Sequence, residues 1–226
     1  MAHRYRPCGD AAALRTNEDA GDISGFQEFS GAINSANTVA ELREALGAHS
    51  DLDYWARYMA VDDAILNYDG VTYFHTDDGS WSHNHNYYFY EDAPSHFLPI
   101  PWDVESTFWI NPDHAAPHWT VVPEDCSATY PYWSGLATAP GCDPVFLALA
   151  SDLAPWRAAV RDLLDGPFAV DTMHEAIDRH EALIREAAQS PDTPTRSGSF
   201  ASAVANTRST IPGLHSRLMQ HLDGER

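Results

Sequence analysis

Aromatic residues are concentrated in the middle of this chain. The protein has 226 residues, 44% of them hydrophobic and 12% aromatic, and nearly all of its seven Trp and ten Tyr lie between Tyr54 and Trp156. Large aromatic side chains are normally buried in a core or line a ligand cleft. A chain of this length and apolar content can bury one sizeable core, so we expect a single domain whose core or cleft is built from this stretch.

The charge balance restricts the partners. The formal net charge is -20, from 33 acidic and 13 basic residues, so attraction to nucleic acid or to an anionic membrane is disfavoured. Basic or Ser-rich protein partners are favoured instead. No apolar run approaches the roughly 20 residues of a membrane helix, and residues 1–9 have no apolar stretch typical of a signal peptide.

Local signals predict the first elements. Residues 1–37 are rich in Gly, Asn and Asp and are expected to form an irregular lead-in. Thr38 followed by Glu41 has the pattern of a capping box, which predicts a helix that Gly47 ends. Apolar residues at helical spacing predict a second helix over residues 51–67.

A β-hairpin is expected next. Residues 87–90 and 97–102 are aromatic and β-branched and are separated by a short polar connection. We therefore assign residues 38–110 to a catalytic core, residues 111–142 to a loop and residues 143–226 to C-terminal helices.

The C-terminal part is expected to hold three helices. Asp143 and Pro144 are typical of a helix start, and this helix is predicted to continue to residue 164. A second helix is predicted over residues 171–188 and a third over residues 199–222, with Pro212 breaking or kinking the third. The stretch between the last two helices, residues 189–199, is linker-like.

Two of the three cysteines bracket a loop. Cys126 and Cys142 enclose a stretch rich in Pro, Gly and aromatic residues that a disulfide could close. Spacing alone leaves open whether the bond forms. If it does, an oxidising compartment follows.

Three polar side chains are expected at the ends of these elements. Asp69 follows the second helix, Asn86 enters the first strand of the hairpin and Asp103 leaves its second strand. Element ends hold side chains on rigid supports at clefts. Protein kinases use Asp, Asn and Asp, in this chain order, to handle the acceptor proton and to bind the metal ions on the phosphates.

The motifs around these residues resemble one family. The run HNYYFYED, a short connection and then PIPWDVESTF are similar to the HNYYLY and PWDLD motifs of the CotH kinase (spore coat protein H) family, and the upstream NYDG resembles the family's Asn-x-Asp turn. The helices from Asp143 onward resemble its C-terminal tail. The resemblance therefore covers most of the chain.

The resemblance implies an α+β, atypical protein-kinase-like fold, mainly the helical C-lobe with a small β-hairpin. It implies transfer of the γ-phosphate of ATP to Ser or Thr of a coat or surface protein, with Mg²⁺ or Mn²⁺ as the metal. Asp69 would then be the catalytic acid and Asn86 and Asp103 the ligands of the nucleotide-bound metal. Glu105, where the family usually has a second Asp, would be a further metal ligand with a longer side chain.

The sequence also departs from the family pattern. Residues 71–83 would be an insertion in the catalytic loop, and no Lys occurs to clamp the phosphates. Arg4 or Arg6 could replace that Lys, the chain could be an N-terminally truncated kinase domain, or the protein could be inactive. We expect truncation, because no sheet pattern of an N-terminal lobe precedes the core.

Two alternatives from other classes stay open. The first is a noncatalytic kinase-like coat or surface protein. The second is a metal-dependent hydrolase that uses histidines and carboxylates, for which spacing alone nominates no complete ligand set. The histidines in question crowd the same region of the sequence: His75, His83, His85, His96, His114 and His118.

Two further acids, Asp62 and Asp63, fall inside the second predicted helix. Such a pair within a helix is typical of a solvated face, with one buried partner.

Overall fold

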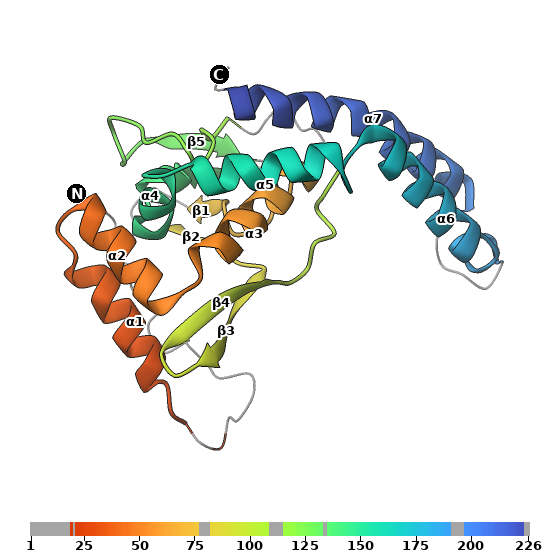
Figure 1. Cartoon of the computed structure of the whole chain (residues 1–226). Helices are drawn as coiled ribbons and strands as arrows, with labels where there is room; N and C mark the ends of the chain where they lie inside the picture. Colours follow the sequence, from red (N-terminus) through yellow and green to blue (C-terminus); the bar gives the residue numbers. More distant parts are fainter. Residues whose placement is uncertain are drawn as a thin grey trace.

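The computed structural model describes residues 19, 21–76, 82–108, 115–132, 135–190 and 197–223. This part of the chain forms an α+β structure of seven α-helices and two small antiparallel sheets (Figure 1). One continuous hydrophobic core joins residues from α1 to α7.

The lead-in, expected to be irregular with at most short helical pieces, contains one helix of 12 residues. Helix α1 spans Ser24–Ser35 and places Phe29 and Ile33 in the core. The helical spacing of Phe26, Phe29 and Ile33 was the available signal, and the neighbouring Gly and Asn residues obscured it.

Helices α2 and α3 match their predictions closely. Helix α2 spans Val39–His49, and the capping box of Thr38 and Glu41 is present, although the helix runs through Gly47. Helix α3 spans Leu52–Ile65 and is capped by the side chain of Asp51. Leu66 ends α3 in the left-handed conformation, with φ 50°.

The predicted hairpin is confirmed and is longer than expected. Strand β3 (Tyr87–Ala93) pairs with β4 (His96–Pro101) in an antiparallel register. Its inner face packs Phe89 and Phe97 against Phe29 of α1, with ring centroids 5.7 Å apart in each case. Figure 1 shows the hairpin beside α1 and below α3.

A second sheet was not predicted. Strands β1 (Phe74–Thr76), β2 (Ser82–His83), β5 (Thr129–Tyr132) and β6 (Gly135–Thr138) form a four-stranded sheet in the order β2-β1-β6-β5. Half of this sheet lies in the assumed catalytic-loop insertion and half in the segment assigned to a loop. The loop assignment is therefore wrong for β5 and β6. The insertion in the catalytic loop stays a prediction.

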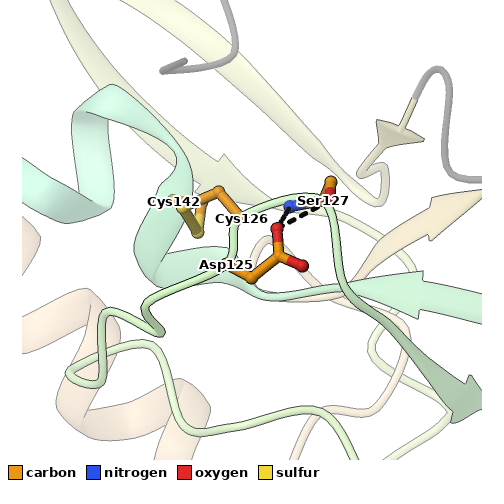
Figure 2. Close-up of a disulfide and its surroundings, with 4 residues drawn as sticks. All are labelled: Asp125, Cys126, Ser127 and Cys142. Atoms are coloured by element: carbon orange, nitrogen blue, oxygen red, sulfur yellow. Dashed lines mark hydrogen bonds between the residues drawn. A yellow bond between two sulfur atoms is a disulfide. The ribbon is translucent and has the colours of Figure 1, made fainter.

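A disulfide closes the segment that carries β5 and β6. Cys126 is bonded to Cys142, the last residue of the 3-10 helix η2 (Pro140–Cys142), at a sequence separation of 16 (Figure 2). Beside it, Asp125 accepts hydrogen bonds from the backbone nitrogen of Ser127 (2.8 Å) and from its hydroxyl group (2.6 Å).

The first C-terminal helix is divided in two, which corrects the prediction for residues 143–164. Helix α4 spans Pro144–Ala150 and α5 spans Ala154–Asp165. Pro155 is in the first turn of α5, where it lacks an N–H group and would clash with the carbonyl of residue 151 in a continuous helix. Asp143 caps α4 and Gly166 ends α5, as predicted.

The last two helices lie side by side as an arm (Figure 1). Helix α6 spans Val170–Gln189 and α7 spans Ser197–Asp223, so Pro212 does not break the helix, and the kink that was the other expected outcome stays a prediction. Pro212 cannot donate to the carbonyl of Arg208, four residues earlier. His174 of α6 lies 3.1 Å from that carbonyl and replaces the missing bond.

The C-terminal half of α7 returns to the core, where Ile211, Leu214 and Leu218 are buried. Across the described ranges, no helix combines the length and apolar character needed to cross a membrane.

Candidate functional site

The NYDG turn fixes one acid at the end of α3. Asn67 and Tyr68 are buried, and the Asn67 side chain donates to Asp62 Oδ1 (3.0 Å) while accepting from the backbone nitrogen of Asp69 (3.4 Å). A Cβ atom on Gly70 would lie 2.8 Å from Asn67 Cγ and 3.0 Å from Asp62 Oδ1, so no side chain fits there. Three residues of this motif are thus structural, and Asp69 is the one whose side chain is partly exposed, at 20%.

Asn86 holds the carboxylate of Asp69. Its Nδ2 donates both to the backbone carbonyl of Asp69 and to Asp69 Oδ2, at 2.9 Å in each case. Because the amide nitrogen is used in this way, the amide oxygen is the atom of Asn86 that remains for a cation.

Asp103 and Glu105 form a carboxyl pair after strand β4. The pKa of Glu105 is raised, first because its carboxyl group shares a hydrogen bond with Asp103 and then because of the negative charge of Asp103. Burial and the charge of Asp69 raise it further. Glu105 is therefore close enough to Asp69 for its pKa to respond to that charge.

Backbone hydrogen bonds bring these segments together. Tyr68 N donates to Ser106 O (3.1 Å), Phe108 N to Ile65 O (2.7 Å) and Trp102 N to Asn86 O (2.8 Å). Asn86 and Asp103 both have positive φ, 61° and 53°. Residues held in this region of φ are concentrated at functional sites, and Asn and Asp adopt it more readily than other residues.

Two histidines approach Asp69, His75 from β1 and His85 from the connection between β2 and β3. His85 Nε2 lies 2.9 Å and His75 Nε2 3.3 Å from Asp69 Oδ1. The pKa of His75 is lowered, mainly by burial and then by the charge of His85, against the opposing effect of Asp69. Tyr132 of β5 lies edge-on to the His75 ring, and its hydroxyl donates to the backbone carbonyl of Tyr68.

The family comparison can now be placed beside this geometry. The model of the family described as CotH kinase protein matches residues 9–216, which is most of the chain. This chain belongs to the CotH kinase protein family. The recognition from the HNYYFYED, PIPWDVESTF and NYDG motifs is confirmed, while no curated protein matches the sequence.

Membership of the CotH kinase family suggests a kinase-like protein and implies ATP as its nucleotide. The three residues nominated from the family motifs lie in one region of the structure, with Asp69 and Asn86 in direct contact. Arg4, Arg6 and His114 lie outside the described residues.

This CotH family member has a second cluster of polar side chains, around Asp63, that the sequence did not predict. Asp63 Oδ2 accepts hydrogen bonds from the indole nitrogens of Trp119 and Trp156, at 3.0 Å each, and His118 Nε2 lies 3.1 Å from Asp63 Oδ1. His221 of α7 stacks on His118 with ring centroids 4.2 Å apart. The expected solvated face is therefore wrong: the Asp63 side chain is only 9% exposed and Asp62 is buried.

The pKa values of the neighbouring Asp62 and Asp63 are shifted in opposite directions. Burial alone would raise the pKa of Asp63, but the charge and hydrogen bond of His118, together with the bond from Trp119, lower it overall. Burial and the charge of Asp63 raise the pKa of Asp62 to about 8. Burial and the charge of His118 lower the pKa of His221 to about 4.

A small cavity of about 40 Å³ lies beside these acids. It is bordered by Asp62, Asp63, Arg217 and His221 among others, and its volume would hold only one or two water molecules. This cavity is too small for a nucleotide and belongs to the structural support of α3.

Of the other histidines considered as metal ligands, His96 pairs with Asp92 on the hairpin at 2.5 Å, and His118 belongs to the Asp63 cluster. His83, in β2, lies beside His75 and His85, with ring centroids 5.9 and 6.3 Å away. Only His75 and His85, of the histidines in the described ranges, join Asp69 in a group able to hold a metal ion.

Proposed function

We propose that this protein has the C-lobe-like architecture of an atypical kinase and transfers the γ-phosphoryl group of ATP to Ser or Thr hydroxyls of a coat or surface protein. One observation carries the proposal. Asp69, Asn86 and the Asp103–Glu105 pair come from three separate segments, and backbone hydrogen bonds hold those segments together at one place.

Asp69 would act on the acceptor hydroxyl. Its carboxylate is held at one oxygen by Asn86 and is partly exposed, so a substrate hydroxyl can reach it. In this position a carboxylate can orient the hydroxyl and accept its proton as the phosphoryl group is transferred.

Asp103, Glu105 and the amide oxygen of Asn86 would hold the metal. Mg²⁺ and Mn²⁺ prefer oxygen ligands of this kind. The fit is supported by the close approach of the two carboxyl groups, which raises the pKa of Glu105 and whose repulsion a divalent cation would relieve. When bound, the metal would neutralise charge on the phosphates.

The surface beside Asp103 suits a nucleotide base. Trp102 and Tyr88 are 58% and 39% exposed, and their ring centroids lie 5.7 Å apart on the outer face of the hairpin. Exposed aromatic rings next to metal-binding carboxylates offer a stacking surface for a base.

A noncatalytic nucleotide-binding protein is the second candidate. The chain has no Lys, the residue that kinases use to position the phosphates. Under this alternative the metal and nucleotide bind but no phosphoryl group is transferred.

The test is thermal unfolding with ATP, with and without Mg²⁺ or Mn²⁺, followed by phosphoryl transfer from labelled ATP to a basic, Ser-rich protein. Binding at 100 times the dissociation constant should stabilise the wild type by about 2.7 kcal/mol. Asp103→Ala should lose the metal-dependent stabilisation and the transfer. Asp69→Asn should retain binding and lose transfer.

Asp92→Ala is the matched control, because it removes a carboxylate from the same hairpin, one that pairs only with His96 among the described contacts. It should behave as the wild type. Wild-type transfer by Asp103→Ala would refute the assignment, and metal-dependent binding without transfer by the wild type would favour the noncatalytic alternative.

A further inference from the structure

Asp69 has a second set of neighbours that phosphoryl transfer does not require. One carboxylate oxygen of Asp69 and one ring nitrogen each of His75 and His85 all lie within 4.8 Å of one another. We propose that Asp69, His75 and His85 form a binding site for a transition-metal ion of the zinc class.

The contact distances fit a shared ion. Zinc binds His nitrogen and carboxylate oxygen at about 2.0–2.2 Å, which places two ligand atoms of a tetrahedral site about 3.3 Å apart. The distances from Asp69 Oδ1 to His85 Nε2 and His75 Nε2 are 2.9 and 3.3 Å. Small side-chain shifts would therefore complete three legs of a tetrahedron.

A buried ring nitrogen points to the same site. His75 Nε2 is inaccessible to solvent and makes no well-formed hydrogen bond within the described residues, and its contact with Asp69 Oδ1 is 3.3 Å long. Buried polar atoms without a hydrogen bond are rare and costly, and those found in native proteins commonly have a functional reason. A metal ion would give this nitrogen its partner.

The second sheet holds both rings in place. His75 is on β1 between β2 and β6, and it pairs in register with His83, two residues before His85. The rings of His75 and His85 lie 4.7 Å apart, and Tyr132 packs edge-on to His75 at 4.5 Å. Asn86 fixes the opposite oxygen of Asp69, as the outer partners of metal-binding carboxylates do.

The chemistry of the ligands separates this site from the one at Asp103 and Glu105. Imidazole nitrogens suit zinc, copper, nickel or iron, whereas oxygen-only sets suit magnesium and manganese. The His85 side chain is 42% exposed, so the proposed site is open to solvent on one side. An open fourth position is typical of zinc sites that take a water molecule or a substrate.

The two roles of Asp69 would compete. A transition metal on Oδ1 would occupy the carboxylate that accepts the proton of the substrate hydroxyl, a consequence that rests on the proposed kinase function. Zinc should then inhibit phosphoryl transfer at a magnesium concentration that saturates the nucleotide site.

The experiment is a titration of the full chain, without a polyhistidine tag or nucleotide, with Co²⁺ followed by visible absorption and then displacement by Zn²⁺. The wild type should bind one ion with the intense bands of a tetrahedral site. His75→Gln and His85→Gln should each weaken binding at least about tenfold. His96→Gln should bind as the wild type, because it removes a histidine that faces a different carboxylate.

Equal affinity in His75→Gln, His85→Gln and the wild type would overturn the proposal, as would a wild type that binds no Co²⁺. Melting in EDTA checks that each variant folds, and His85→Gln carries the test if the more buried His75 variant does not. The titration contains no ATP, so its outcome is independent of transfer activity. Co²⁺ binding without transfer would retain this site and refute the kinase proposal. Transfer without Co²⁺ binding would retain the kinase proposal and refute this site.

Discussion

Two aspartates near the end of α3 have similar neighbours and different surroundings. Asp63 faces His118, with His221 stacked behind it, and Asp69 faces His75 and His85. Both oxygens of Asp63 are satisfied, by two indole N–H groups and by His118. A fully satisfied buried network of this kind stabilises a fold.

The Asp69 cluster is incompletely satisfied. The side chain is 20% exposed, His75 Nε2 makes no hydrogen bond in the described part of the chain, and the charge of Asp69 contributes to the raised pKa of Glu105. Such an arrangement contributes little to stability and leaves atoms able to bind a ligand. Asp63 therefore stabilises the fold, whereas Asp69 is available to bind a ligand. This difference can be tested.

The largest expected effect is on the stability of the Asp63 variant. Asp63→Ala leaves two indole N–H groups and a histidine without their acceptor inside the core, so it should lower the free energy of unfolding by about 3–5 kcal/mol. Asp69→Ala should change it by less than about 1 kcal/mol, because that side chain is partly exposed. Urea unfolding measures both, and equal losses would remove the distinction between the two clusters.

The disulfide should have the next largest effect. Replacing Cys126 and Cys142 together with Ser opens a loop whose ends are 16 positions apart, and a loop of this size is worth about 3 kcal/mol. The loop carries β5 and β6, which pack against the His75 side of the Asp69 cluster. Co²⁺ affinity should therefore fall along with the melting temperature.

Reduction of the wild type should reproduce that result. Unchanged melting with and without reductant would mean that the second sheet is held by its own packing. A stability loss with unchanged Co²⁺ affinity would show that the metal ligands do not depend on the loop.

The smallest expected effect is a pH dependence at Asp62, beside the stable cluster. Burial raises the pKa of Asp62 from 3.8 to about 8, so the folded state binds more protons than the unfolded state between these values. Stability should therefore fall as pH rises through this window. Asp62→Asn should flatten that fall, so the stability of the variant relative to the wild type should rise as pH rises through this window.

Several charged groups surround Asp62 and need a control. Asp63 raises its pKa, and Arg217 and His221 of α7 line the same cavity. Asp143, whose pKa burial raises to about 7, titrates in the same window in both proteins, so the difference between variant and wild type isolates Asp62. Parallel pH curves for the two proteins would contradict the prediction.

Local signals were sufficient for part of this fold. The capping box at Thr38 and the paired apolar strands of the hairpin are contained in short stretches of sequence, and both were predicted. The ends of these elements then located Asp69, Asn86 and Asp103. Physical contact between Asp69 and Asn86 followed from the turn and the strand that position them.

Features that depend on distant partners could not be predicted in the same way. Strands β1, β2, β5 and β6 have two to four residues each, and β1 pairs with β6 some 60 positions later. The acceptor role of Asp63 depends on Trp119, Trp156 and His118, which are distant in sequence. The continuity of α7 through Pro212 depends on His174 of another helix.

The missing space at Gly70 has a consequence for mutational scanning. Any side chain there would collide with Asn67 and Asp62, whereas the neighbouring Asp69 has an accessible side chain. A library sorted only for soluble expression should therefore reject nearly every change at position 70 and accept many at position 69. Sorting the same library for activity should make both positions intolerant, so the two screens together would separate residues that build the turn from the residue that the turn presents.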